Sequence, residues 1–284
     1  MADDASEMFM RHLRLCRNAV LPGNRLPFRI GPNLVGWLLP EFAAAVRRVA
    51  RLEPDAYGGV TLPAARADEL AAIAEELRLE GRYHRRGEAF DVRVGHETPP
   101  ITTIDRGAVP PFGITSRGVH CNGLVRRPDG LYLWVARRAA NKRNDPGKLD
   151  HIVAGGISAG MSPTETLLKE ANEEAAVPFD LAARARPVAQ ISYAMERGEG
   201  LRRDLLHCYD LHLPEDFVPH PNDDEVEGFE LWPIGRAVEA VRDGDSFKFN
   251  VNLVLIDLFL REGLIAAAQG ADVLRQELDR NISD

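Results

Sequence analysis

The chain has 284 residues, and its content of 45% hydrophobic and 27% charged residues is ordinary for globular domains with a buried core. This length exceeds one average domain and suits two. The formal net charge of −8 argues against a general nucleic-acid-binding protein, because such domains are normally basic.

Three widely spaced cysteines, Cys16, Cys121 and Cys208, suggest neither a disulfide framework nor a CxxC metal site, which favours a reducing compartment. The first seven residues are acidic and lack the apolar run of a signal peptide. The longest apolar stretches, such as 253–260, are far shorter than the ~20 residues needed to span a bilayer. We therefore expect a cytoplasmic protein with no membrane partner.

The first part of the chain predicts mostly helices. Helix-like apolar spacing occupies residues 7–20, 34–52 and the stretch from Leu62 to Gly81, and residues 88–94 alternate like a short strand. Four prolines in residues 97–112 make that stretch a poor place for a helix or a central strand. The sequence therefore predicts a smaller α+β N-terminal domain.

We place the domain boundary in this proline-rich stretch, which gives domains of 1–112 and 113–284. The second domain begins with strands at 119–126 and 131–137, joined by a Pro-Asp-Gly turn. Its other predicted elements are strands at 187–194 and 205–213 and helices at 163–175, 234–242, 250–262 and 270–280. Strands and helices without strict alternation predict an α+β fold in which a mixed sheet lies between helices.

The helix at 163–175 carries the most informative pattern. Ser162 is a good N-cap, Pro163 suits the first helical position, and Glu165 completes a capping box. Glu170, Glu173 and Glu174 follow at i, i+3 and i+4, so they share one face of the helix. Three crowded carboxylates raise one another's pKa, and a hard cation such as Mg²⁺ or Mn²⁺ removes this repulsion. The alternative for such a string is a solvated acidic face.

The glycines before this helix, Gly155, Gly156 and Gly160, allow backbone conformations that are closed to other residues. With Gly155 as its first residue, the segment resembles the Nudix box, G-x5-E-x7-R-E-U-x-E-E-x-G-U, in which U is a bulky aliphatic residue. Glu170, Glu173 and Glu174 fall on the metal-binding glutamates of that motif. It departs from the box at Met161 for Glu, Lys169 for Arg, Ala171 for the first aliphatic residue and Ala176 for Gly.

Segments outside the box are similar to one branch of the Nudix hydrolases, in which a family-specific N-terminal domain precedes the Nudix domain. They are Phe112-Gly-Ile, Gly118-Val-His-Cys-Asn-Gly, Pro146-Gly-Lys-Leu-Asp-His-Ile-Val-Ala-Gly-Gly, Cys208-Tyr-Asp-Leu, Asp224-Glu-Val-Glu-Gly-Phe-Glu and Phe247-Lys-Phe-Asn. This branch includes plant Nudix enzymes and the Nudix portion fused to thiamine pyrophosphokinase in fungi. The resemblance implies an α/β/α sandwich and hydrolysis of oxidised thiamine diphosphate analogues to the monophosphate and phosphate.

Basic residues suited to a diphosphate gather between Arg126 and Lys148. Arg137, Arg138 and Lys142 follow a strand and precede the glycine loop, so phosphate binding and a solvated loop are equally favoured for them. With Gly155, Gly156 and Lys169 they form the predicted phosphate-binding set. For Arg126, Arg127 and Arg143 we favour the solvated loop.

A further metal ligand or general base is expected from a late acidic loop. Glu225 and Glu227 are the candidates, with a weak preference for Glu227, and the alternative is an exposed acidic turn. No role is assigned to His120 or His151. The aromatic residues that could stack on a substrate ring, Tyr193, Trp232 and Phe249, are more often ordinary core residues.

The sequence therefore predicts a metal-dependent hydrolase of a small-molecule diphosphate. One alternative is a hydrolase of oxidised nucleoside di- or triphosphates such as 8-oxo-dGDP, because the box reads metal and phosphate and not the organic group. Another is a non-catalytic Nudix-like binding module. The N-terminal domain either narrows the substrate pocket or forms a homodimer interface, and the sequence does not decide between these roles.

Overall fold

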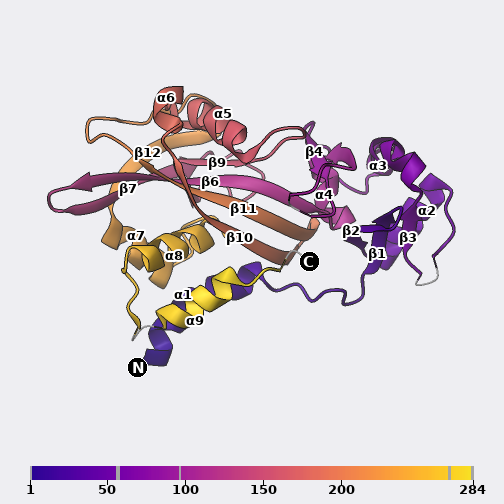
Figure 1. Ribbon diagram of the computed structural model, residues 1–284, viewed down its shortest axis with the longest axis horizontal. Coiled ribbons are helices and arrows are strands. Elements are labelled where there is room, and N and C mark those ends of the chain that lie inside the picture. Colours follow the sequence, from indigo (N-terminus) through magenta and orange to yellow (C-terminus); the bar gives the residue numbers. More distant parts are fainter. Residues whose placement is uncertain (1, 56–57, 96, 268–269, 283–284) are drawn as a thin grey trace.

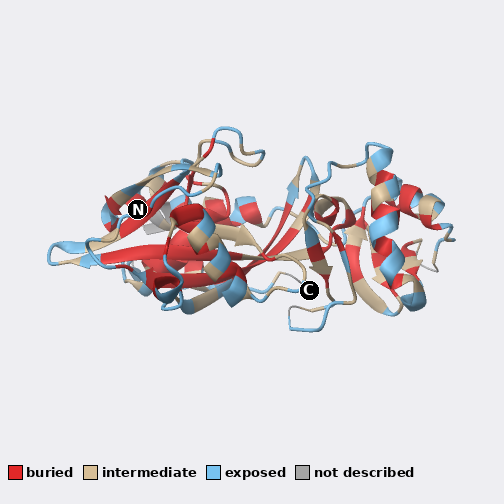
Figure 2. Cartoon of the chain, turned by 90° about the horizontal axis from the view of Figure 1, so that it is seen from above, coloured by how far each residue is buried: buried red, intermediate tan, exposed pale blue. Residues whose placement is uncertain are grey.

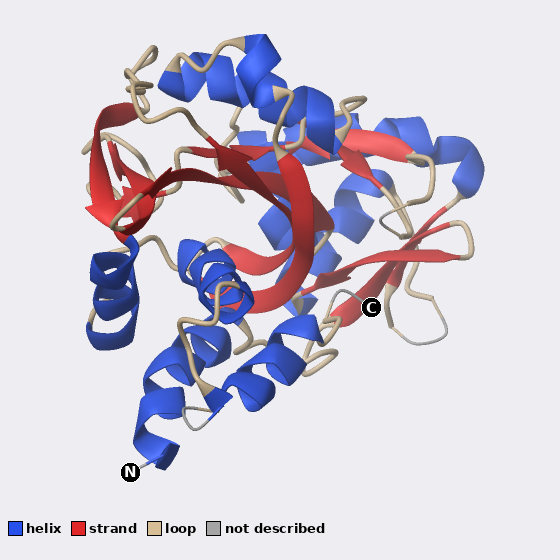
Figure 3. Ribbon diagram, turned by 60° about the vertical axis from the view of Figure 1, so that its left-hand side comes forward, coloured by secondary structure: helices blue, strands red, loops and turns tan. Residues whose placement is uncertain are grey.

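A strongly curved seven-stranded mixed sheet forms the centre of the larger part of the molecule (Figures 1 and 3). The computed structural model describes residues 2–55, 58–95, 97–267 and 270–282. The main strand order is β10 (Arg186–Arg197), β11 (Gly200–His212), β6 (Thr115–Arg127), β7 (Gly130–Arg138) and β12 (Val226–Pro233). Two short strands extend it, because β8 (Leu149–Asp150) pairs with β7 and β9 (Val153–Gly156) pairs with β6. Only the β11–β6 pairing on the main path is parallel.

Helices cover both faces of this sheet, which makes an α/β/α sandwich (Figure 3). One face packs against α5 (Pro163–Ala175) and α6 (Phe179–Ala182), and the other packs against α7 (Ile234–Asp243) and α8 (Val251–Arg261). Successive strand residues point to opposite faces. Leu133 accordingly joins the core beneath α7 and α8, whereas its neighbour Trp134 joins the core beneath α5. The prediction of a mixed sheet between helices is confirmed.

The first helix, α1 (Ala2–Cys16), lies beside the last, α9 (Ala271–Asp279), on the α7–α8 side of the sheet (Figure 1). Phe9, Leu13 and Cys16 are buried in the same core as α8. The ring of His12 is hydrogen-bonded to the carbonyl of Val241, 2.7 Å away. The N-terminal helix is therefore part of the larger body, and the predicted boundary at residue 112 stays a prediction.

The N-terminal region forms a separate α+β part with its own buried core (Figure 2). Its three-stranded sheet has the order β2 (Asn33–Leu38), β1 (Leu26–Ile30) and β3 (Val60–Leu62). The helices of this part are α2 (Pro40–Ala50), α3 (Leu70–Leu79) and the one-turn α4 (Val109–Phe112). A two-stranded ribbon of β4 (Ala89–Val92) and β5 (Thr102–Asp105) lies nearest the large sheet, and 3₁₀ turns occur at Ala64–Glu69 and Arg106–Ala108.

The expected helix at 34–52 was wrong at its start, because residues 34–38 belong to strand β2. The residue before a proline is driven out of the helical region. Leu39 is accordingly extended, and Pro40 opens the helix. The proline-rich stretch also contains the β5 strand and α4, whose first turn accommodates Pro110 and Pro111. Among the described residues, no helix is both long and apolar enough to cross a membrane.

Candidate active site

The ends of α5 are held by local backbone chemistry. The Ser162 side chain accepts a hydrogen bond from Glu165 N–H, and the Glu165 carboxylate accepts one from Ser162 N–H at 2.9 Å. The predicted capping box is therefore present. At the other end Ala176 adopts the left-handed conformation, with φ of 51°, at the position that the motif gives to glycine. Both ends fix the helix that carries the three glutamates.

Close approach, and not backbone conformation, explains the first two glycines of the box. Of Gly155, Gly156 and Gly160, only Gly160 has a positive φ. A Cβ on Gly155 would lie 2.6 Å from both Cγ and Cδ of Glu170. A Cβ on Gly156 would lie 2.6 Å from the ring of Phe90. Glycine at 155 therefore lets Glu170 lie against the loop backbone.

Glu174 is buried beside the same strand. Its carboxylate accepts a hydrogen bond from Ala154 N–H at 2.8 Å. Burial raises the pKa of Glu174 well above its ordinary value, and the nearby charge of Glu170 raises it further. Burial also raises the pKa of Glu170. The protein alone therefore stabilises these negative charges poorly.

Lys169 bridges the other two glutamates. Its ammonium lies 2.7 Å from Glu173 Oε2 and 3.3 Å from Glu170 Oε1. Glu173 is about half exposed. A lysine at the position that the motif gives to arginine thus still orients two of the three carboxylates, as a point charge instead of a planar fork.

The donor set of Glu170, Glu173 and Glu174 fits a hard divalent cation. All three side chains offer oxygen and come from one turn of α5, burial raises the pKa of two of them, and Glu170 and Glu174 lie against β9. A bound cation would offset the cost of burying Glu174 as a carboxylate. These are the residues that would hold Mg²⁺ or Mn²⁺.

A second group, His120, Asp150 and His151, has its potential ligand atoms within 4.8 Å of one another, and all three residues are buried. The carboxylate of Asp150 already forms ion pairs with two cations, Arg138 at 2.7 Å and Lys248 at 3.6 Å. Burial would raise the pKa of Asp150, but these cations lower it overall. The group therefore fits a bound metal poorly and forms a polar support beneath the cleft.

A cleft of about 1090 Å³ lies in front of the glutamate helix. Glu170 and Glu173 line it, together with Gly155, Gly156 and Lys169 of the predicted phosphate-binding set. The lining also includes residues 81–84 and Arg106 of the N-terminal region. The N-terminal part therefore forms a wall of the cleft, which is one of the two roles that the sequence left open.

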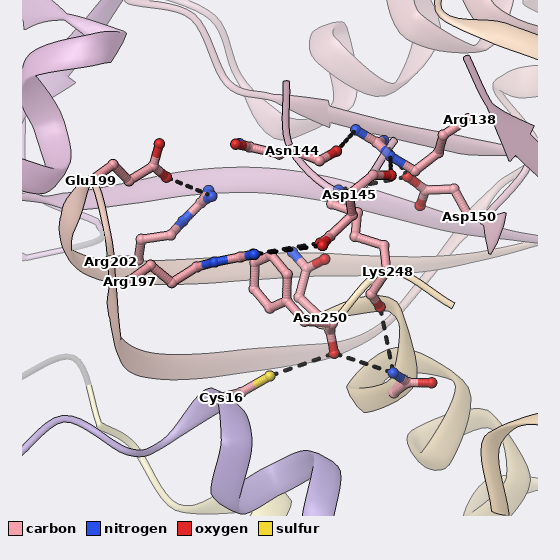
Figure 4. A network of polar contacts seen from close by, with 12 residues as sticks. Cys16, Arg138, Asn144, Asp145, Asp150, Arg197, Glu199, Arg202, Lys248 and Asn250 are labelled. Carbon is pink, nitrogen blue, oxygen red and sulfur yellow. Dashed lines mark hydrogen bonds and ion pairs between the residues drawn. The ribbon is translucent and has the colours of Figure 1, made fainter. Parts of the chain in front are cut away.

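The predicted basic residues divide between cleft and surface. Arg138 and Lys142 line the cleft, whereas Arg137 lies outside it, bonds to the carbonyl of Gly147 and is 3.9 Å from Glu230. The guanidinium of Arg138 contacts Asp150 and the carbonyls of Asn144 and Asp145 (Figure 4). Arg138 thereby braces the loop that carries Lys142, and a direct phosphate role for Arg137 is not supported by its position.

The late acidic loop contributes Glu225 to the cleft, where it forms an ion pair with Lys142. Glu227 is not among the lining residues, and its carboxylate accepts a hydrogen bond from Ala140 N–H at 2.9 Å. Burial alone would raise the pKa of Glu225, but Lys142, Arg106 and Arg138 together lower it, so Glu225 is held ionised. We therefore revise the preferred late carboxylate from Glu227 to Glu225.

The aromatic candidates are core residues. Tyr193, Trp232 and Phe249 are all at most 5% exposed. The guanidinium groups of Arg197 and Arg202 lie 4.6 and 5.5 Å from the centre of the Phe249 ring. The face of Phe249 is thus occupied by arginine, and a ring-stacking role for these residues is not supported.

Several cleft residues were missed by sequence reasoning. They are Arg86, Arg106, Arg197, Arg202 and Lys248. Arg143, for which the sequence favoured a solvated loop, also lines the cleft. Lys248 lies in the Phe-Lys-Phe-Asn segment that carried the family resemblance, so a signal existed for it. Arg106 lies almost fifty residues before Gly155, and no local pattern connects it with the box.

Comparisons with known proteins agree with this geometry. The model of the NUDIX domain matches residues 117–251, and the model of a domain of unknown function, DUF4743, matches residues 8–116. The chain is 38% identical over 252 residues to "Nudix hydrolase 24, chloroplastic" of Arabidopsis thaliana, and the alignment covers 86% of this chain and 69% of that protein. It is 34% identical over 280 residues to "Nudix hydrolase 20, chloroplastic" of the same plant, covering 93% and 75%.

Among solved structures, the chain is similar to DR0079 from Deinococcus radiodurans. The two share 24% identity, the alignment covers 59% of this chain and 97% of that one, and the TM-score is 0.46.

Proposed function

The chain belongs to the Nudix hydrolase family, and we propose that it hydrolyses the diphosphate of a small organic molecule with Mg²⁺ or Mn²⁺. Nudix hydrolases generally use divalent metal ions. The metal-binding residues in this proposal are Glu170, Glu173 and Glu174.

One observation supports this site above the others: Glu174 is 7% exposed and has a raised pKa, and the hydrogen bond that its carboxylate accepts comes from an uncharged backbone group, Ala154 N–H. A buried carboxylate is costly unless it is paired or coordinates a metal. Glu170 lies beside it against Gly155. A divalent cation bound by both carboxylates would stabilise this arrangement.

The bound cations would neutralise diphosphate charge and lower the pKa of a coordinated water. Lys142 and Lys169 line the cleft, where each is paired with a carboxylate. Their positive charges would also offset the negative charge of an arriving phosphate. Glu225 is ionised and lines the cleft, which suits it to accept the proton of the attacking water. The products are a monophosphate and inorganic phosphate when the bond broken is that of a terminal diphosphate.

The substrate class that we propose is thiamine diphosphate analogues, above all oxidised forms. It is motivated by the whole-chain resemblance to the thiamine-linked branch. A site that hydrogen-bonds an added carbonyl can select strongly against the compound that lacks it. Such a site would spare the normal cofactor.

A hydrolysis screen tests both levels of the proposal. The full chain is assayed with Mg²⁺ or Mn²⁺ on thiamine diphosphate, oxidised thiamine diphosphate, 8-oxo-dGDP, ADP and ADP-ribose, with products identified by mass spectrometry and an excess of chelator as control. We expect metal-dependent turnover and the highest kcat/KM for an oxidised thiamine compound. If 8-oxo-dGDP or another nucleotide is preferred, the thiamine assignment is wrong. If no diphosphate is cleaved, the enzymatic proposal is wrong and a binding module is favoured.

A further inference from the structure

The N-terminal part is bonded directly to the loop that precedes the glutamate helix. Ala159 N–H donates a hydrogen bond to the Ala89 carbonyl at 2.7 Å, and the Ser158 hydroxyl donates one to Glu88 Oε1 at 2.6 Å. Gly160 N–H also lies 3.3 Å from the Asp91 carboxylate. These contacts fix the β4 strand and its neighbours against the active-site loop.

Arg106 extends from this docked segment onto the glycine pair. Its guanidinium carbon lies 3.4 Å, and Nη2 lies 3.5 Å, from the position of a Cβ on Gly156. Its Nη1 donates a hydrogen bond to Glu88 at 2.8 Å. The side chain is 46% exposed and lines the cleft. Glu88 therefore aims a partly exposed guanidinium at the loop on which Glu170 lies.

Other arginines gather around the same wall from separate parts of the chain. Arg86 and Arg202 both lie near Glu199, at 3.7 and 3.2 Å, and Arg143 comes from the loop between β7 and β8. Burial lowers the pKa of Arg86, and the positive charges of Arg143, Arg106 and Arg202 lower it further. Three other guanidinium groups thus lie close enough to Arg86 to disfavour its charge, whereas Glu199 favours it.

Carboxylates neutralise this wall only in part: Asp204 also lies 3.4 Å from Arg202, but among the described residues Arg143 takes part in no ion pair. Glu88 pairs with Arg106, and Glu199 is shared between Arg86 and Arg202. An anion with several oxygens stabilises clustered guanidinium groups. Each planar guanidinium can donate two parallel N–H bonds to two oxygens of such an anion. A phosphate group meets this requirement.

We propose that Arg106 and Arg86 bind phosphate oxygens of the substrate diphosphate from the side opposite the glutamate helix, so that the N-terminal part completes the active site. The inference rests on the proposed function, because it takes the ligand to be the diphosphate that is hydrolysed. Arg143 and Arg202 add positive charge around the same group.

A binding experiment tests the inference without turnover. Methylenediphosphonate, a diphosphate analogue whose bridge is not hydrolysed, is titrated calorimetrically into the full chain with Mg²⁺. We expect Arg106→Gln to weaken binding roughly 10- to 100-fold, since a hydrogen bond to a charged group contributes about 1.5–3 kcal/mol and each 1.4 kcal/mol is tenfold. The dissociation constant of Arg106→Lys should lie between those of wild type and Arg106→Gln, because lysine keeps the positive charge and loses the planar pair of N–H donors.

Two controls separate phosphate binding from support of the loop. Arg48→Gln removes an ion pair of similar exposure with Glu80, elsewhere on the N-terminal part, and should leave the dissociation constant unchanged. Glu88→Gln removes the charged partner that orients Arg106 but keeps the guanidinium and an acceptor for Ser158, so it should weaken binding clearly less than Arg106→Gln does. An equal loss in Glu88→Gln and Arg106→Gln would mean that Arg106 only supports the loop, and would overturn the inference.

The remaining outcomes separate this inference from the proposed function. If the wild-type chain hydrolyses a diphosphate and Arg106→Gln binds the analogue as tightly as wild type, the inference is overturned and the proposed function stands. If wild type cleaves no diphosphate but binds the analogue through Arg106, the phosphate site stands and the hydrolase assignment fails. If wild type does not bind the analogue, the inference is overturned.

Discussion

Glu170 lies so close to Gly155 that a Cβ at position 155 would be 2.6 Å from two carbon atoms of the Glu170 side chain. The atoms in conflict belong to a flexible side chain and not to the backbone. The smallest possible substitution at this glycine should therefore move the carboxylate and leave the strand in place.

Gly155→Ala is expected to lower kcat at least tenfold while changing the thermal unfolding midpoint little. Displacing a ligand by about 1 Å can cost about 10²-fold in rate. Gly228→Ala is the matched control, because Gly228 is also in a strand and no atom lies within 4 Å of its added Cβ. Equal activity of the two variants would show that the position of Glu170 is not critical.

Glu174→Gln is expected to lower kcat by about 10²-fold or more, because the amide keeps an acceptor for Ala154 N–H but loses the charge that binds metal. Without metal at neutral pH the variant should unfold at the same temperature as wild type or higher, since it no longer buries a group whose charged form is disfavoured by burial. Circular dichroism and kinetics measure both. Unchanged kcat would make the glutamate face structural only.

Stabilisation by Mn²⁺ should grow between pH 5 and pH 8. Burial raises the pKa of Glu174 above its ordinary value, so the protonated group favours folding at low pH. That contribution is lost as the pH rises through the folded pKa, and the metal-free protein then carries a buried charge. Metal binds the deprotonated form, so protons compete with it at low pH. A shift of the unfolding midpoint by Mn²⁺ that is independent of pH would contradict this prediction.

Glu225→Gln should reduce kcat more than Glu227→Gln. Glu225 lines the cleft and is ionised beside Lys142, whereas Glu227 caps the backbone at Ala140. A lost general base costs about 10²–10⁴-fold. Steady-state kinetics of both variants, compared at matched metal concentration, decide the order. The reverse order would restore the preference drawn from the sequence.

Ala176→Gly should stabilise the protein by about 1 kcal/mol, because a left-handed conformation costs an L-residue about 1–2 kcal/mol and glycine escapes most of it. The unfolding midpoint should rise by about 2–4 °C. Ala175→Gly, one residue earlier and inside the helix, should change stability in the opposite direction. A lower midpoint for Ala176→Gly would contradict the prediction.

The sequence predicted those features of the fold that depend on neighbouring residues. The capping box at Ser162, the helical spacing of the glutamates and the hairpin after Arg127 are all local, and all are present. The β12 strand was missed, because its partner β7 lies far earlier in the chain. The β1 strand was missed although β2 follows it directly, because the helix-like spacing from residue 34 onward hid the β2 half of this hairpin.

The same division applies to the candidate site. Glu170, Glu173 and Glu174 share one helical turn, so their spacing alone placed them together. Arg106 faces Gly156 only because the N-terminal part folds against the loop before α5. The distinction between Glu225 and Glu227 depends on which way a strand end turns, which short-range patterns do not encode.

The position of α1 has a consequence for how the protein is made. His12 is bonded to Val241, a separation of 229 residues, and Leu13 is buried with the last two helices. During synthesis the apolar face of α1 must therefore wait for almost all of the following chain before it can be covered. Contacts of such long range slow folding and leave hydrophobic surface open to aggregation. Polypeptides that terminate before α8 would carry this helix uncovered and become targets for chaperones and proteases.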